Sequence, residues 1–172
     1  MVKLNKTTEY ALIALSYIRE KKAGELTSAR EIAKEFRLPF EILAKTLQKL
    51  KEHKVIDSTY GTRGGYVLNL DLKKISLLEF LKIMEGPVGV VSCINGSNIK
   101  NHSTDLTGCE FHSGCQIKPM MSVLNKKIYD FLDRITLDEL TAVPIKNSKT
   151  VDLAHLNAQS TAFEVVLSGE EP

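Results

Sequence analysis

Apolar and polar residues alternate with the period of an α-helix over most of the first fifty positions. A first helix is predicted to follow a cap at Asn5 or a nearby threonine and to stop before Gly24, because its apolar positions lie three or four residues apart: Ala11, Ala14, Leu15 and Ile18. A second, shorter helix is predicted through Phe36, since Ser28 and Glu31 have the spacing of a capping box.

A third helix is predicted to begin at Pro39, whose fixed φ suits the first position of a helix. Its apolar positions are expected to face the core, and they are Phe40, Leu43, Leu47 and Leu50. The opposite face is polar and mostly basic, with Glu41, Lys45, Gln48, Lys49 and Lys51. Two short helices joined by a tight turn at Arg37, the second polar on its outside, resemble a helix-turn-helix.

Two runs rich in β-branched and aromatic residues follow, at positions 55–60 and 66–70, and a glycine-rich turn separates them. They predict a β-hairpin. Directly after a helix-turn-helix, such a hairpin forms the wing of a winged helix, and Arg63 at its tip suits a phosphate or narrow minor-groove contact. The alternative is an ordinary hairpin with an exposed arginine.

The rest of the chain predicts two more helices. Ser76 and Glu79 form a second capping box, which opens a helix that ends before Gly86. A long helix is predicted from Pro119, with a heptad-like apolar seam at Met121, Leu124, Ile128, Phe131 and Ile135. The seam can pack on its own domain or against a second copy of the chain. We expect a mainly α fold with a small β-hairpin wing, in which a winged helix-turn-helix is followed by a long dimerisation helix, and the protein is a homodimer.

Three segments are predicted. Residues 1–86 form the winged-helix DNA-binding domain, residues 87–143 hold a cysteine loop and the dimerisation helix, and residues 144–172 form a tail that we expect to be partly disordered.

Charge is distributed unevenly along the chain. Residues 1–74 carry 15 basic and 9 acidic residues, a net charge of +6, whereas the whole chain has a net charge of +2. A basic front half suits a polyanionic partner such as double-stranded DNA, although a solvated basic face gives the same signal. No apolar run approaches the roughly 18 residues that cross a bilayer, so no membrane partner is expected. The first residues lack a signal-peptide core, which predicts a cytoplasmic protein with reduced thiols.

All three cysteines fall between positions 92 and 119, in a stretch with few apolar residues. Cys93, Cys109 and Cys115 can converge as thiolates on zinc or on an iron-sulfur cluster, with a fourth ligand from elsewhere. His112 lies between two of them and would complete a structural zinc site. A bare thiol switch is a further alternative. Catalysis is disfavoured, because no glycine-rich phosphate loop and no base-orienting context accompany the cysteines.

Three motifs together resemble the winged-helix iron-sulfur transcription regulators represented by IscR and NsrR. They are the opening run from Leu4 to Ala11, the wing tip Arg63-Gly-Gly-Tyr66, and a three-cysteine loop before a long helix that ends in the run from Ile135 to Leu140. The resemblance covers roughly residues 1–143. It implies a homodimer that crosses its long helices, binds DNA with the winged helix, and senses iron-sulfur status, nitric oxide or redox state through a cluster, either 2Fe-2S or 4Fe-4S.

The chain also departs from that family. Fifteen residues separate Cys93 from Cys109, an expanded interval, whereas the five between Cys109 and Cys115 match. In IscR a histidine follows the last cysteine by three positions, and here Lys118 stands there. In relatives like NsrR a carboxylate at the start of the first helix of the other subunit completes the site, and Glu9 occupies that position.

The fourth ligand therefore has several candidates. Glu9 is the first choice, and without the resemblance it reads as a first-turn acid favoured by the helix dipole. His112 is the rival and His102 a remoter candidate, whereas His53 and His155 are expected on the surface.

The predicted DNA is an operator with twofold-related half-sites. The predicted DNA-binding residues come from the second and third helices and the wing: Ser28, Pro39, Phe40, Glu41, Lys45, Gln48, Lys49, Lys51, Tyr60, Thr62, Arg63 and Gly64.

Overall fold

The computed structural model describes residues 4–22, 24–61, 64–89 and 115–143. The described elements follow one another as helices α1 (Lys6–Glu20), α2 (Ala29–Phe36) and α3 (Phe40–Glu52), strands β1 (Ile56–Thr59) and β2 (Gly65–Leu68), the 3-10 turn η1 (Leu72–Lys74), and helices α4 (Leu77–Glu85), α6 (Lys118–Arg134) and α7 (Leu137–Thr141). The mainly α architecture with a β-hairpin wing is as predicted. The cysteine segment from 90 to 114 and the tail from 144 onward lie outside the described residues.

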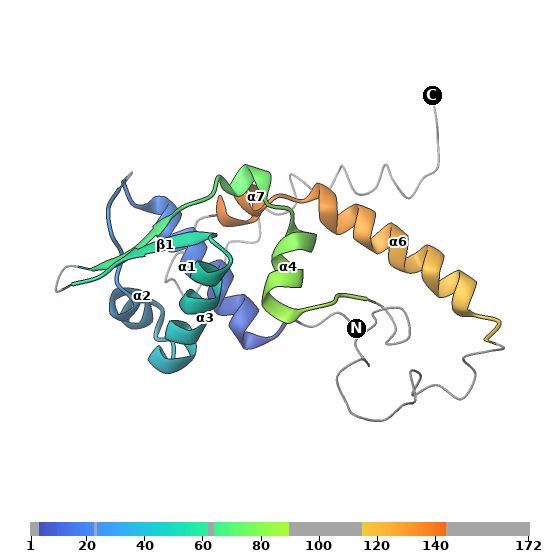
Figure 1. Ribbon diagram of the computed structural model, residues 1–172, viewed down its shortest axis with the longest axis horizontal. Coiled ribbons are helices and arrows are strands. Elements are labelled where there is room, and N and C mark those ends of the chain that lie inside the picture. The colour runs from blue at the N-terminus through green and yellow to red at the C-terminus, as the bar shows by residue number, and fades with distance from the viewer. Residues whose placement is uncertain (1–3, 23, 62–63, 90–114, 144–172) are drawn as a thin grey trace.

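Helix α1 runs through the middle of the core. It packs against α3, α4, α7 and β2. The largest fully buried side chains come from several of these elements and include Leu15, Ile32, Leu43, Leu47, Leu50, Ile56, Phe80 and Leu137. Figure 1 shows this body with the hairpin extending from one side and α6 projecting from the other. The core therefore fixes the helix-turn-helix and the wing to one support.

The predicted starts of α1, α2 and α4 are confirmed by their caps. Asn5 caps α1, and its Oδ1 accepts the backbone N–H of Thr8 at 2.8 Å. Ser28 and Ser76 cap α2 and α4, where each hydroxyl accepts the N–H of the glutamate three positions on. These side chains satisfy donors that the first turn of a helix leaves without backbone partners.

Two details of α3 differ from the sequence expectation. Pro39 is the cap residue, and the helix begins one position later, at Phe40. The Phe40 side chain was expected in the core but is 45% exposed. It lies in the first turn, where the helix has not yet come down onto the core. Thr46 is fully buried instead, and its hydroxyl donates to the Ile42 carbonyl at 2.8 Å.

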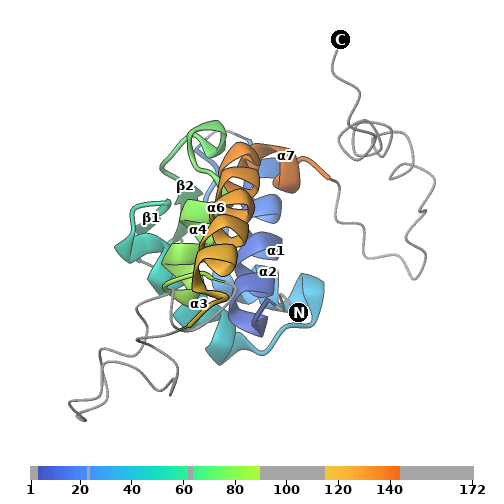
Figure 2. The ribbon, with the colours of Figure 1, turned by 90° about the vertical axis from the view of Figure 1, so that its right-hand side faces the viewer.

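Helix α6 packs on α4. The ribbon views show that α6 extends outward from the side of the molecule on which α4 lies (Figures 1 and 2). Its last turn is joined to the start of α4, because the Leu77 N–H donates to the Ile135 carbonyl at 2.7 Å and the Leu137 N–H donates to the Ile75 carbonyl at 3.0 Å. The Ser76 hydroxyl adds a hydrogen bond to Asp133 at 2.8 Å.

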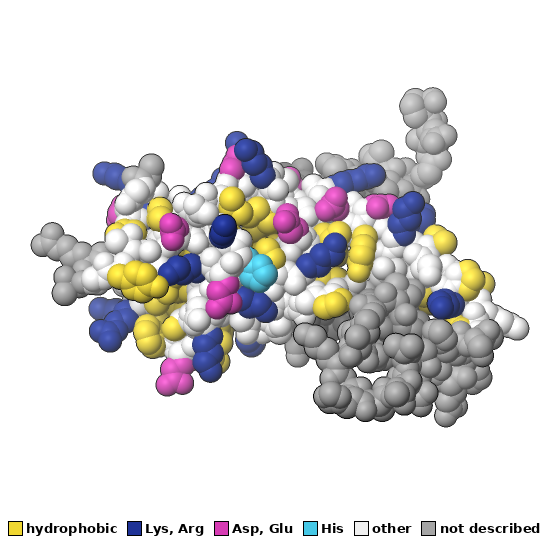
Figure 3. All heavy atoms as spheres, in the orientation of Figure 1, with side chains coloured by type: hydrophobic (Ala, Val, Ile, Leu, Met, Phe, Trp, Pro, Cys, Tyr) yellow, Lys and Arg dark blue, Asp and Glu magenta, His cyan; other side chains and the backbone are white. Residues whose placement is uncertain are grey.

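The outer side of α6 is apolar and uncovered. Leu124 and Phe131 of the predicted seam are 40% and 54% exposed, and Met120 and Val123 are 65% and 59% exposed. Figure 3 shows hydrophobic side chains at the surface over this helix. The other seam residues, Met121, Ile128 and Ile135, are half-buried. Within the described ranges, no helix combines the length and apolar character that crossing a membrane requires.

Candidate nucleic-acid interface

The turn between α2 and α3 sets the angle at which α3 leaves the core. Arg37 ends α2 in the left-handed region, with φ of 52° and ψ of 41°. The Leu38 N–H donates back to the Ala33 carbonyl at 2.9 Å and closes the turn. This geometry turns the chain sharply into Pro39, so α3 presents one full side to solvent.

The solvent side of α3 is a polar stripe. Glu41, Lys45 and Gln48 are exposed and lie four and three residues apart, opposite the buried leucines of the same helix. The Gln48 amide donates to Glu52 Oε1 at 3.2 Å, so the stripe continues for one more turn. Amide, ammonium and carboxylate groups of this reach can bond to base edges in a major groove.

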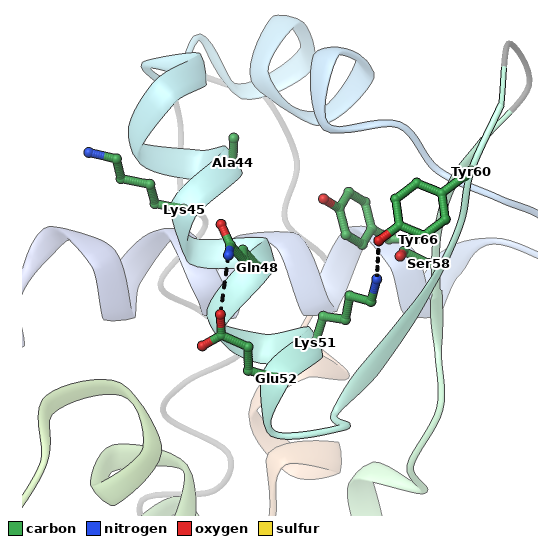
Figure 4. Close-up of a pocket in the computed structure, with 8 residues that line it drawn as sticks. All are labelled: Ala44, Lys45, Gln48, Lys51, Glu52, Ser58, Tyr60 and Tyr66. Atoms are coloured by element: carbon green, nitrogen blue, oxygen red, sulfur yellow. Dashed lines mark hydrogen bonds between the residues drawn. The ribbon is translucent and has the colours of Figure 1, made fainter.

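A groove of about 500 Å³ separates α3 from the wing. Figure 4 shows its lining side chains, which come from both elements: Ala44, Lys45, Gln48, Lys51, Glu52, Ser58, Tyr60 and Tyr66. The groove is polar at the helix and aromatic at the wing, and it opens beside the polar stripe of α3. The interface therefore consists of a helix face and a wing with a recess between them.

Lys51 and Tyr60 close one end of this recess. The Lys51 ammonium donates to the Tyr60 hydroxyl at 2.9 Å and lies 4.6 Å from the ring centroid. This hydrogen bond lowers the pKa of Tyr60, because the neighbouring positive charge favours the phenolate, and it raises the pKa of Lys51. Tyr60 is 85% exposed, so its other side is open to a ligand.

The wing is anchored by backbone contacts. The Thr27 N–H donates to the Tyr66 carbonyl at 3.0 Å, and the Tyr66 N–H donates to the Thr27 carbonyl at 2.8 Å. A Cβ on Gly65 would lie 2.9 Å from the Thr27 carbonyl carbon and oxygen, and one on Gly64 would lie 2.3 Å from the Thr59 oxygen. Both glycines are therefore needed for close backbone approach: Gly65 lies against the segment that enters α2, and Gly64 lies against the opposite side of the hairpin.

The predicted DNA-binding residues occupy different positions in this interface. Glu41, Lys45, Gln48 and Tyr60 are exposed on it, whereas Ser28 caps α2 and Lys49 Nζ donates to the Met84 carbonyl at 2.9 Å. Thr62 and Arg63 lie outside the described residues. A role of each residue in DNA binding stays a prediction.

Two residues of this surface were not identified from the sequence. Ile42 is 41% exposed on α3, and the Arg30 guanidinium lies 6.0 Å from the centroid of the Phe40 ring. Ile42 breaks the apolar spacing of α3, and this break was a signal that it does not belong to the core. Arg30 had no such signal, because its contact depends on how α2 crosses α3.

The described residues contain part of the predicted metal site. Glu9 lies in the first turn of α1, where its carboxylate pairs with Lys6 at 2.6 Å and is 38% exposed. Cys115 is a half-buried free thiol just before α6. Cys93, Cys109, His102 and His112 lie outside the described residues, as does His155, whereas His53 is exposed as predicted. In the ranges that the structure describes, no three His, Cys, Asp or Glu side chains gather as metal ligands would.

The positions of α1 and α6 bear on this site. Figure 1 places the start of α6 at the far end of the molecule from the winged helix, well away from the start of α1. Within one chain, Cys115 and Glu9 therefore belong to separate regions.

Comparison with known proteins places these features in context. Residues 4–143 match the Rrf2 family, described as "Iron-dependent Transcriptional regulator". The HTH-type transcriptional regulator NsrR of Bacillus licheniformis is 26% identical over 139 residues, which are 81% of this chain and 92% of that protein.

Solved structures share the fold. CymR (YrzC), the global cysteine regulator of B. subtilis, superposes with a TM-score of 0.63 at 21% identity, covering 84% of this chain and 100% of that one. IscR of T. potens superposes with a TM-score of 0.56 at 19% identity, covering 89% and 96%. The predicted resemblance and fold class are confirmed.

Proposed function

Because the chain belongs to the Rrf2 family of iron-dependent transcriptional regulators, we propose that it binds operator DNA as a homodimer and senses its signal through an iron-sulfur cluster. The relatives are named as transcriptional regulators, which is a non-enzymatic role. The observation that carries the DNA-binding part is the polar stripe of α3 beside the recess and the wing.

The proposed DNA contacts follow from the shape of the interface. Helix α3 enters the major groove with Glu41 and Gln48 toward the base edges and Lys45 toward phosphate. The hairpin then lies along the backbone, where Tyr60 and the glycine-rich tip meet phosphate or the minor groove. The basic balance of the front half of the chain supports this arrangement, since phosphate contacts dominate affinity for DNA.

The proposed dimer uses α6. Leu124 and Phe131 lie on a long helix whose outer side is apolar and exposed in the single chain. A second copy of the same helix would cover this side, because a twofold axis brings identical surfaces together. Such a dimer would also present two copies of α3 to twofold-related half-sites.

The proposed cluster ligands are Cys93, Cys109 and Cys115 of one subunit and Glu9 of the partner subunit. Thiolates are the usual ligands of iron-sulfur clusters, and an exposed carboxylate is a chemically acceptable fourth donor. The separation of α1 from the start of α6 within one chain supports a ligand from the second chain. When bound, the cluster would supply a centre that oxidants or nitric oxide can alter.

Anaerobic reconstitution followed by native mass spectrometry tests this proposal. We expect iron and sulfide in the dimer, and a different affinity for duplex DNA selected from a random pool when the cluster is removed. Glu9→Ala is expected to destabilise the cluster, whereas Glu20→Ala, an acid in the last turn of the same helix, is expected to leave it intact.

Other results would point elsewhere. Colourless protein with stoichiometric zinc would favour a structural site made by the three cysteines and His112. A disulfide found after peroxide treatment of metal-free protein, with DNA binding changed to match, would favour a thiol switch.

A further inference from the structure

The end of α4 bonds to three separate elements. We call residues 84–88 the α4 junction. The Met84 carbonyl accepts from Lys49 of α3 at 2.9 Å. Glu85 Oε1 accepts from the Asn5 N–H at 3.0 Å and from the Thr8 hydroxyl at 2.7 Å, at the start of α1. The Val88 carbonyl accepts from the Tyr129 hydroxyl of α6.

The junction has a distinctive place in the sequence. Five residues after Val88 comes Cys93, and the Thr8 residue that Glu85 holds is followed directly by Glu9. The junction therefore lies between α3 and both parts of the chain that carry the proposed cluster ligands. Its hydrogen bond to α3 is made by the side chain of Lys49.

Lys49 has a physical reason to bond there. The Met84 carbonyl belongs to the last four of α4, which lack a partner inside the helix. A lysine ammonium satisfies this acceptor, and its charge interacts favourably with the negative end of the helix dipole. Lys49 is half-buried, whereas Lys45, one turn earlier on α3, is exposed and bonds to none of the described residues. Of these two lysines, Lys45 is therefore the one whose charge is available for phosphate in this structure.

We infer that Lys49 is a positioning residue that fastens α3 to the α4 junction, and that the state of the cluster reaches the DNA-binding surface through this junction. This inference rests on the proposed function for its signal. Its structural part, that Lys49 does not contact phosphate, stands separately.

Two variants of α3 that each remove one positive charge make a matched test. Lys45→Gln and Lys49→Gln are compared with the natural protein for affinity toward the selected DNA between 50 and 200 mM salt, with and without the cluster. Loss of one phosphate contact reduces the slope of log affinity against log salt by about 0.9. Because both subunits of the proposed dimer carry the substitution, Lys45→Gln alone is expected to reduce the slope by about 1.8, for two lost contacts.

Lys49→Gln is expected to keep the natural salt slope and to reduce the ratio of affinities between cluster-loaded and cluster-free protein toward one. Lys49→Arg is expected to restore that ratio, because a guanidinium can also donate to the Met84 carbonyl. A salt slope that falls in Lys49→Gln as it does in Lys45→Gln would overturn the inference.

Amide hydrogen exchange separates this inference from the proposed function. If the natural protein binds DNA equally with and without the cluster, the sensing proposal fails. The fastening role of Lys49 is then tested by the rate of amide exchange and by the salt dependence of DNA affinity. We then expect faster exchange at the Gly86 N–H, which donates to the Lys82 carbonyl, in Lys49→Gln but not in Lys45→Gln. Unchanged exchange would refute the fastening role. Should Lys49→Gln not fold, Lys49→Met removes the same charge and the donor while keeping an unbranched side chain, with a natural slope and faster Gly86 exchange expected and a lowered slope contradicting the assignment.

Discussion

Lys51 of α3 and Tyr60 of the wing are joined by a hydrogen bond of 2.9 Å, and the ammonium also lies 4.6 Å from the aromatic ring centroid. The contact spans the recess between the two elements that are proposed to bind DNA. It therefore fixes how far the wing stands from the helix.

The first prediction concerns the ionisation of Tyr60. Its pKa lies below the ordinary value of tyrosine because Lys51 donates to its oxygen and adds a positive charge nearby. Absorbance titration at 295 nm, with Tyr60→Phe subtracted, is expected to show one tyrosine that ionises at lower pH than a free phenol. Lys51→Gln should move that transition up. An unchanged transition in Lys51→Gln would mean that the pair does not form in solution.

The second prediction concerns stability against acid. Glu31 accepts from Lys21 at 2.7 Å and from the Tyr17 hydroxyl at 2.9 Å, and the Lys21 hydrogen bond lowers the pKa of Glu31 below 4.5. A carboxyl with a lowered folded pKa contributes stability above its unfolded pKa and loses it as pH falls through the folded value.

Urea unfolding at several pH values measures this contribution. Glu31→Gln is expected to lower the free energy of unfolding by about 0.5–1 kcal/mol at pH 7, since the pair is partly exposed. The difference should shrink below pH 4.5. Glu20→Gln, at the exposed end of α1, serves as the control, and an equal loss in both variants would assign the effect to general surface charge.

The third prediction concerns the exposed side of α6. Phe131→Glu is expected to give a monomer by light scattering after size exclusion, because a carboxylate would be buried in the proposed dimer interface. Leu70 is 42% exposed on a different surface, and Leu70→Glu should remain a dimer. A dimer that survives Phe131→Glu would move the interface away from this helix.

The fourth prediction concerns the attachment of the wing. Gly65→Ala would place a Cβ 2.9 Å from the Thr27 backbone and is expected to cost about 1–3 kcal/mol of unfolding free energy. Gly24→Ala meets no atom within 4 Å but stands at a φ of +81°, so it should cost about 1–2 kcal/mol from backbone strain alone. The Thr27 and Tyr66 amide hydrogens should exchange faster in Gly65→Ala, because their hydrogen bonds are lost, and should be unchanged in Gly24→Ala.

Local rules predicted most of the fold. The capping serines, the leucine spacing of α3 and the two runs of β-branched and aromatic residues all act within a few residues, and the caps, the helix and the two paired strands are found where the sequence indicated. Phe40 was misplaced because helical periodicity treats the first turn of a helix like its middle, whereas the first turn here still stands off the core.

The less predictable features are contacts between distant residues. Lys49 bonds to a carbonyl 35 positions away, and nothing in the pattern around either residue indicates the other. The same holds for Gly65. A side chain is excluded at this position because the Thr27 backbone lies against it, and the sequence around Gly65 does not indicate that contact. Of the predicted cluster ligands, the described residues include Glu9 and Cys115, so the ligand set stays a prediction.

The backbone pairing of Thr27 with Tyr66 has a consequence for regulation. It joins the wing to the segment that enters α2, so that α2, α3 and the hairpin form one rigid unit. A rigid unit resists changes in which bases it reads. In the proposed dimer, a signal can therefore change the distance and the rotation between the two winged helices. Control of this kind would discriminate operators by the number of base pairs between their half-sites.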